Sequence, residues 1–226
     1  MKVSKFNEYE KRAYSTVYTE GDETFHDSII KEFAEKFLPE LKIPKKALIL
    51  DIGCGPGIFM DAAKNLGYKN LLGITLSKED HAACKKKGFK TLNSSMSDLN
   101  QKDGTVDFIW CRHAIEHSPY PLFTLYEFHR VLKDSALVYI EVPAPDNERL
   151  FMHEFNPNHY SILGDRMWQG LFEKAGFAVV NSFTYDVDVS VESGKHQEKN
   201  LIYILQRSQE DIAKIFAEKY GIKVEN

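Results

Sequence analysis

Short apolar runs alternate with amphipathic stretches along most of the chain. The apolar runs are rich in Ile, Leu, Val and aromatic residues, as strands buried on both faces are, and occupy residues 47–52, 70–75, 106–111 and 136–142. The stretches between them have helical spacing with a closing glycine or a first-turn proline, and occupy residues 57–66, 77–87 and 119–132. Strands that alternate with helices predict a parallel sheet with helices on both faces.

The C-terminal quarter of the chain follows a different order. Residues 165–175 predict a helix closed by Gly176, and residues 178–185 and 201–206 predict two strands joined by a polar turn. Because that connection is too short to contain a crossover helix, we expect the last strand to run antiparallel to the others. Residues 208–220 have the amphipathic period of a C-terminal helix.

The stretch before the first strand is mostly helical by period up to residue 39. No internal repeat or Gly/Ser linker divides the chain, and its 226 residues suit one large core. We therefore expect an α/β fold with three parts: an N-terminal helical cap at 1–44, the main domain at 45–207, and a C-terminal helix at 208–226.

Composition narrows the class of protein. The chain has 29 Lys and Arg against 33 Asp and Glu, so a basic surface for nucleic acid is not expected. No apolar run approaches the roughly 20 residues that cross a bilayer, and the N-terminus has no apolar signal-peptide core. Three separated cysteines, Cys54, Cys84 and Cys111, make no complete disulfide framework. We expect a soluble cytoplasmic protein without membrane or nucleic-acid partners.

A glycine-rich loop, Asp-Ile-Gly-Cys-Gly-Pro-Gly at residues 51–57, lies where the first strand gives way to a helix. Glycines there let a ligand approach the backbone, and the helix N-terminus offers N–H groups to an anionic or carboxylate-bearing ligand. A dinucleotide fingerprint would place its third glycine one position later, where Ile58 stands, and an acid at the end of the second strand, where Thr75 stands. Both departures disfavour NAD.

The Asp-x-Gly-x-Gly-x-Gly pattern resembles the first motif of the class I S-adenosylmethionine-dependent methyltransferases. The resemblance extends over about residues 47–206 and includes a helix end at residues 125–133 that is similar to the family's Glu-x-x-Arg-Val-Leu-Lys. It implies a Rossmann-like, doubly wound, seven-stranded and mostly parallel sheet with an antiparallel last strand. It also implies S-adenosyl-L-methionine as cofactor, S-adenosyl-L-homocysteine as product and a small-molecule acceptor.

The resemblance assigns cofactor contacts along the carboxyl edge of the sheet. The glycine loop would lie under the methionine part, the end of the strand at 70–75 beside the ribose, and the small polar run at 94–98 beside the adenine. The implied cofactor-binding residues are Asp51, Gly53, Cys54, Gly55, Gly57, Thr75, Leu76, Asp80, Ser97, Asp98, Cys111 and Arg112.

One of these assignments replaces a missing acid. Gly73-Ile74-Thr75-Leu76-Ser77 resembles the version in the cyclopropane-fatty-acid-synthase branch, in which a polar side chain on the next helix binds the ribose. The matching position here is Asp80. The same residues also form a plausible helix cap, with Ser77 as N-cap and Asp80 as a first-turn acid, and both roles can coexist.

Two histidines follow the predicted strand at 106–111, and imidazole is the natural base near neutral pH. His113 and His117 are therefore the candidate catalytic residues, although Glu116-His117 recurs in family members with different acceptors and equally suits a loop-building role. The spacing His113-x-x-Glu116-His117 also fits a zinc-binding pattern. That pattern belongs on a helix with a distant third ligand, and here it follows a buried strand, so we expect no metal.

The acceptor-binding segment is expected in an insertion at 145–164. Its aromatic and polar residues suit a small-molecule site, with His153, His159 and Tyr160 as candidate contacts; alternatively, the segment is a lid that packs its own aromatics. The N-terminal tyrosines at positions 9, 14 and 18 either cover the cofactor or pack a helix on the sheet.

The sequence therefore predicts methyl transfer to a small-molecule acceptor, with oxygen favoured over nitrogen or carbon. The tripeptide at 118–120 comes seven residues after Cys111, too late for the motif of enzymes that methylate DNA bases or glutamine amides. Two alternatives stay open. One is carbon methylation of the cyclopropane-synthase kind, in which the glutamate matching Glu116 helps to hold a bicarbonate base. The other is an inactive module that binds the cofactor or a partner.

Overall fold

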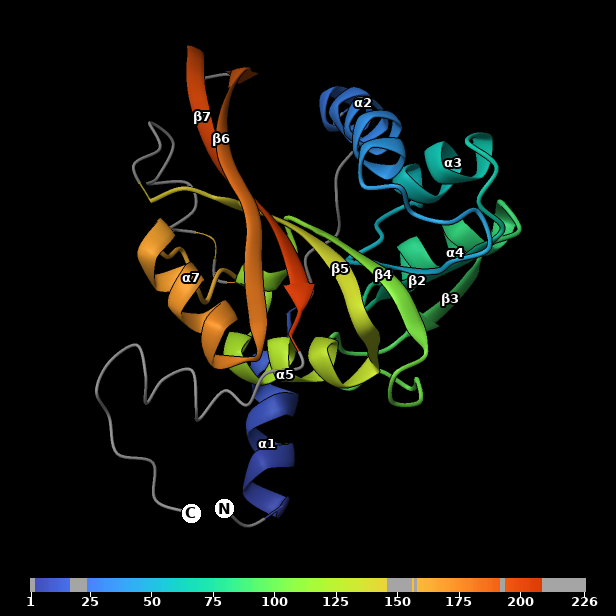
Figure 1. Ribbon diagram of the computed structural model, residues 1–226. Coiled ribbons are helices and arrows are strands. Elements are labelled where there is room, and N and C mark those ends of the chain that lie inside the picture. Colours follow the sequence, from blue (N-terminus) through green and yellow to red (C-terminus); the bar gives the residue numbers. More distant parts are fainter. Residues whose placement is uncertain (1–2, 17–23, 146–155, 157, 192–193, 209–226) are drawn as a thin grey trace.

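The computed structural model describes residues 3–16, 24–145, 156, 158–191 and 194–208 (Figure 1). Its strands are β1 (Leu48–Ile52), β2 (Asn70–Thr75), β3 (Lys90–Asn93), β4 (Val106–Arg112), β5 (Leu132–Pro143), β6 (Phe177–Val191) and β7 (Gly194–Arg207). Its helices are α1 (Val3–Ala13), α2 (Thr24–Glu40), α3 (Ile58–Asn65), α4 (Lys78–Lys86), the 3₁₀ turn η1 (Ile115–His117), α5 (Pro121–Val131) and α7 (Asp165–Lys174).

All seven strands belong to one sheet in the order β3-β2-β1-β4-β5-β7-β6. The pairs among the first five are parallel, whereas β7 runs antiparallel to both β5 and β6. This confirms the predicted doubly wound sheet and its antiparallel last strand. The strand order reverses between β1 and β4, and the carboxyl ends of these strands open the crevice in which such sheets bind ligands.

Apolar side chains form two core layers, one on each face of the sheet. On one face α5 and α7 bury Phe128 and Trp168 against the strands, and on the other face α2, α3 and α4 pack (Figure 1). There the rings of Trp110 and Tyr139 stack at 3.9 Å between centroids, and Phe59 continues the stack. Each large apolar side chain contributes about 1.5–3 kcal/mol on burial, so these layers hold the carboxyl edge rigid.

Several element ends differ from the sequence prediction. The helix after η1 begins at Pro121 instead of residue 119, because residues 118–120 form the connection from η1. β5 begins at Leu132, directly where α5 ends, and the β6–β7 hairpin extends beyond the rest of the sheet (Figure 1). The predicted helix at 208–220 lies outside the described residues, apart from its first position.

The predicted helical cap consists of two separate helices. α2 packs on α3, while α1 lies by α5, where the Tyr9 hydroxyl donates to the Pro119 carbonyl oxygen at 3.2 Å (Figure 1). The cap therefore contributes to both the α2–α3 layer and the opposite end of the molecule.

None of the helices in the described ranges has both the length and the hydropathy to cross a membrane.

Candidate functional site

The loop after β1 can adopt its shape because its glycines accept left-handed backbone angles. Gly53, Gly55 and Gly57 have φ of 68°, 47° and 86°, values that other residues rarely adopt. A Cβ on Gly53 would lie only 2.7 Å from the Cβ of Ala114, just after β4. The loop is also tied to β2, since the Gly53 amide donates to the Ile74 carbonyl at 2.9 Å.

An open cavity of about 800 Å³, a volume that includes its mouth, lies above the carboxyl ends of β1, β2 and β4. Such a volume suits a nucleoside-sized ligand together with a small second molecule. One half is built by the glycine loop, the end of β2 and the start of α4: Gly53, Gly55, Ile74, Thr75, Leu76, Ser77 and Asp80. The other half is built by His113, Ala114, His117, Asn158 and Tyr160. The cavity is also lined by Ala13, Tyr14, Thr16, Ser94 and Met96.

A second hollow of about 330 Å³ lies on the α2 side of the glycine loop. Asp51, Cys54 and Arg112 border it together with Gly53, which also borders the larger cavity. The structure thus brings these four residues, all expected at the cofactor, to one place. The side-chain hydrogen bond with Cys84, together with burial, raises the pKa of the Cys54 thiol, so this cysteine is a neutral, compact part of the wall.

Four of the expected cofactor residues border neither hollow. Cys111 is fully buried within β4, and Gly57 caps α3 beneath the loop. The Ser97 hydroxyl is buried against the Thr124 hydroxyl at 2.6 Å, and Asp98 is exposed. Their cofactor contacts stay predictions.

The start of α4 combines a helix cap with a side chain in the cavity. Ser77 is the N-cap and accepts from the Asp80 amide at 3.1 Å, as the capping prediction requires. Asp80 also lines the cavity, and burial raises the pKa of its carboxyl despite the hydrogen bond to Ser77. The geometry therefore permits both predicted roles of this region.

His113 lies between two buried carboxylates. Its Nε2 is 3.0 Å from Glu141 Oε1 and its Nδ1 is 3.6 Å from Glu116 Oε1. Burial and the Arg112 charge would lower the pKa of His113, but the two carboxylates raise it to about 9. The ring is therefore fixed as a cation, an arrangement that suits positioning and charge more than proton removal at neutral pH.

Glu141 is the centre of a buried polar network. It is fully buried in β5 and accepts from Arg112 Nε at 3.0 Å, from Tyr139 Oη at 2.7 Å and from Tyr185 Oη at 2.8 Å, besides His113. Burial would raise the pKa of Glu141, but Arg112 and His113 lower it to about 2. Sequence reasoning missed this residue, although a charged residue inside the apolar run at 136–142 was a signal for it.

His117 lines the cavity beside the segment that returns after β5. Its Nδ1 lies 3.0 Å from the Asn158 carbonyl oxygen, so Nδ1 carries the proton that it donates there. In the neutral ring the lone pair is then on Nε2. The rings of His117 and His159 are 4.7 Å apart between centroids.

The N-terminal region closes one side of the cavity. Tyr14 lines it and lies 3.2 Å from Ser95 Oγ, while Tyr160 donates from its hydroxyl to the Ala13 carbonyl oxygen at 2.8 Å. Of the two alternatives for the N-terminal tyrosines, the covering role therefore suits Tyr14 and the packing role suits Tyr9. Tyr18 and His153 lie outside the described residues.

Ser94 is a cavity residue that sequence reasoning did not select. It directly follows β3, and its buried hydroxyl has no hydrogen-bond partner among the residues that the structure describes. A buried hydroxyl without a partner is costly, so a ligand group in the cavity is its natural partner. The sequence feature that could have indicated Ser94 is the small polar run at 94–98, of which only Ser97 and Asp98 were predicted to bind the cofactor.

Comparison with known proteins agrees with this geometry. Residues 23–182 match the family model described as a methyltransferase domain. The chain is 28% identical over 182 residues to a protein of Aspergillus luteorubrus named "Probable methyltransferase ltbC", a match that spans 73% of this chain and 59% of that protein. It is 35% identical over 112 residues to the methoxy mycolic acid synthase MmaA3 of Mycobacterium tuberculosis, over 47% of this chain and 38% of the synthase.

The fold is shared with solved structures at low sequence identity. A SAM-dependent methyltransferase from Archaeoglobus fulgidus superposes with a TM-score of 0.64 at 16% identity, over 89% of this chain and 99% of that one. The chain thus spans nearly all of this structural relative, but only 59% of the Aspergillus protein and 38% of the synthase.

Proposed function

Because this chain belongs to the class I S-adenosylmethionine-dependent methyltransferases, we propose that its cavity joins that cofactor to a small acceptor molecule, which is methylated at oxygen. The observation that carries the proposal is the continuity of the cavity. The glycine loop and Asp80 form one half, and His113 and His117 form the other, so two ligands can meet above β1 and β4. Enzymes of this kind gain most of their rate from such positioning.

The residues present fit the cofactor. The hollow at Asp51 and Arg112 would take the amino-acid end, and the glycine loop, which has no side chains at three positions, allows a ligand to lie against its backbone. Asp80 would accept from the ribose hydroxyls, and the unpartnered Ser94 hydroxyl would bind a polar group farther along the cavity. The half that His117 lines would receive the acceptor, to which the cofactor would supply its methyl group.

The reaction requires one bond to break and one to form. S-adenosylmethionine would supply the methyl group: the acceptor oxygen would bond to the methyl carbon as the carbon–sulfur bond breaks, with the electron pair left on sulfur, to give S-adenosylhomocysteine. The acceptor's proton leaves on the side where His117 offers an imidazole lone pair. His113, held as a cation by Glu116 and Glu141, would form a rigid part of the wall in this half of the cavity.

Oxygen is favoured over carbon by two considerations. The name of the MmaA3 synthase refers to a methoxy group, which is a methyl group on oxygen. A polar acceptor half with two histidines also suits an acceptor that must lose a proton. Carbon methylation of the cyclopropane-synthase kind is the second candidate, because Glu116 lies beneath the cavity in contact with His113.

The experiment that tests the proposal is an acceptor screen that measures formation of S-adenosylhomocysteine. Phenols and other hydroxylated small molecules, amines, and an unsaturated phospholipid are incubated with the protein and S-adenosylmethionine. We expect turnover with a hydroxylated acceptor and a methyl ether as product. Turnover with only the unsaturated lipid would establish the carbon alternative, and a methylated amine would move the assignment to nitrogen.

Asp80→Asn should weaken S-adenosylmethionine binding by about 10- to 100-fold, because hydrogen bonds to a charged group contribute about 1.5–3 kcal/mol. Helix α4 should keep its stability, since Ser77 still caps it. Isothermal titration calorimetry measures the affinity, and Glu79→Gln, an exposed acid on the same turn, is the matched control. An unchanged Kd in the Asp80 variant would leave Asp80 with its capping role alone.

His117→Ala should lower turnover of the identified acceptor by about 100-fold or more while the affinity for S-adenosylmethionine stays within about twofold. The reason is that His117 belongs to η1, whereas Asp80 belongs to α4 and the glycine loop follows β1. Steady-state kinetics and cofactor titration on the same sample separate the two effects. Wild-type turnover in this variant would remove His117 from the reaction.

A further inference from the structure

The side chain of Glu116 is a buried carboxylate in the turn η1. It is 1% exposed, and neither of its oxygens has a hydrogen-bond partner in the described part of the chain. The ion pair with His113, at 3.6 Å, is longer than a hydrogen bond. An ion pair without hydrogen bonds offsets only part of the cost of burying a carboxylate, so a further group at these oxygens would stabilise it.

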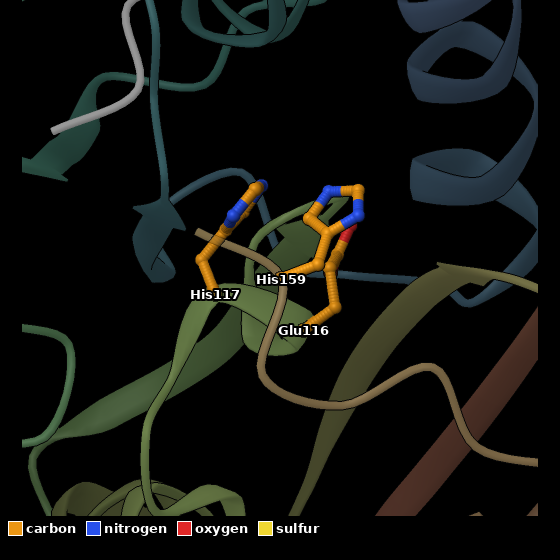
Figure 2. Close-up of side chains that lie close together, drawn as sticks. All are labelled: Glu116, His117 and His159. Carbon is orange, nitrogen blue, oxygen red and sulfur yellow. The ribbon is translucent and has the colours of Figure 1, made fainter. Parts of the chain in front are cut away.

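Tertiary contacts bring two imidazoles to this carboxylate. His117 follows Glu116 on η1, and His159 arrives on the segment after β5 (Figure 2). That segment is tied to η1, because the amides of Tyr160 and Ser161 both donate to the Glu116 carbonyl oxygen, at 2.8 and 3.2 Å. One oxygen of Glu116 and one ring nitrogen of each histidine all lie within 4.8 Å of one another.

We propose that Glu116, His117 and His159 form a binding site for one divalent transition-metal ion, with Zn²⁺ as the ion that the donor set suits best. Two imidazoles and one carboxylate are a common set for zinc that keeps a position open for another ligand. Mg²⁺ and Ca²⁺ prefer oxygen donors alone. The small contraction from 4.8 Å that bonds of about 2 Å require is within the reach of side-chain rotation.

The backbone already orients one of these ligands. The hydrogen bond from His117 Nδ1 to the Asn158 carbonyl oxygen fixes the ring and its tautomer, so that Nε2 is the nitrogen able to bind the ion. Metal-binding histidines are usually held in this way by a carbonyl or carboxylate on the other nitrogen. The Asn156 amide lies 3.4 Å from His159 Nε2 and contributes to the position of the second ring.

The site differs from the zinc pattern that the sequence contains. In His113-x-x-Glu116-His117 both histidines would be ligands, but Nε2 of His113 is engaged by Glu141 at 3.0 Å. The distant residue that the sequence pattern lacked is His159, 43 positions after Glu116 and brought beside it by the fold (Figure 2). The expectation of no metal, which rested on that pattern, is therefore replaced by this proposal.

An open coordination position would face the acceptor half of the cavity, because His117 lines it. An acceptor oxygen bound there would become more acidic, and its proton would leave to solvent instead of to His117. This role rests on the proposed function, whereas ion binding itself does not. The two can therefore be tested separately.

The test is a titration of the full chain with Zn²⁺, after removal of any polyhistidine tag and dialysis against a chelator. Calorimetry and elemental analysis give the affinity and stoichiometry, and Co²⁺ serves as a second probe through its visible absorption. We expect one ion per chain. Glu116→Gln and His159→Ala should each weaken Zn²⁺ binding by at least about tenfold. His129→Ala, a histidine on α5 that contacts Phe177, is the matched control and should bind as the wild type does.

Each outcome decides the proposal. Absence of Zn²⁺ binding to the wild type, or equal affinity in the His159→Ala variant, overturns it. His159 is partly exposed, so this variant should fold even if Glu116→Gln does not, and circular dichroism checks both. Titration of the same samples with S-adenosylmethionine keeps the readouts apart. Zinc bound without the cofactor would sink the proposed function alone, and the cofactor bound without zinc would sink the metal site alone.

Discussion

Gly53→Ala should abolish S-adenosylmethionine binding, with a rise in Kd of at least about 100-fold, or about 2.7 kcal/mol. The new Cβ would lie 2.7 Å from the Cβ of Ala114, a short, rigid side chain that cannot rotate away. Carbon atoms need about 3.5–4.0 Å, so the loop must retreat by roughly 1 Å from the end of β4. The φ of 68° adds about 1–2 kcal/mol of backbone strain for any residue with a Cβ. Calorimetry on the folded variant measures the loss.

Gly88→Ala separates strain from collision. Gly88 has a similar φ of 81°, but a Cβ there would meet nothing within 4 Å. This variant should lose about 1–2 kcal/mol in unfolding free energy and keep the wild-type affinity for the cofactor. If Gly53→Ala folds and binds as tightly as Gly88→Ala does, the close approach of the glycine loop to β4 has no part in cofactor binding.

Glu141→Gln should destabilise the protein by about 3–5 kcal/mol at pH 7, the usual cost of removing one partner of a buried ion pair. The carboxylate accepts from Arg112, His113 and two tyrosines, and an amide can neither balance the two cations nor accept from all four donors. Urea denaturation measures the difference. Asp134→Asn, which breaks the exposed pair with Arg207, is the control and should cost no more than about 1 kcal/mol.

The same carboxylate predicts a dependence on pH. Its pKa is about 2 in the folded protein against 4.5 for the ordinary group, so ionised Glu141 stabilises the fold above pH 4.5. That stabilisation, about 3 kcal/mol for such a shift, should be lost as the pH falls from 4.5 toward 2. The gap between wild type and Glu141→Gln should therefore narrow over this range. A constant gap would show that packing, and not charge, explains the cost of the substitution.

The pattern of the sequence was sufficient for the architecture. The alternation of apolar runs and helical stretches predicted the strands and helices because buried parallel strands and amphipathic helices have different periods. The glycine loop was predictable for a local reason: three left-handed backbone angles close together require glycine. The same reasoning predicted Ser77 as the N-cap of α4, since a cap depends on residues three positions apart.

Element ends were less predictable where a loop could pack in more than one way. The proline at position 119 satisfied the rule for a helix start as well as Pro121 does, and only the packing of η1 selects Pro121. The length of the β6–β7 hairpin likewise depends on pairing between strands and not on the apolar period of either one.

The sequence by itself determined the α/β order, the glycine loop and the position of two histidines shortly after β4. The tertiary structure alone decided that His113 is held between Glu116 and Glu141, and that His159 lies beside Glu116 and His117. Hydrophobic period specifies which face of its own element a side chain occupies. It carries no distance between elements 28 or 43 residues apart, because loop conformation and packing across the sheet set those distances.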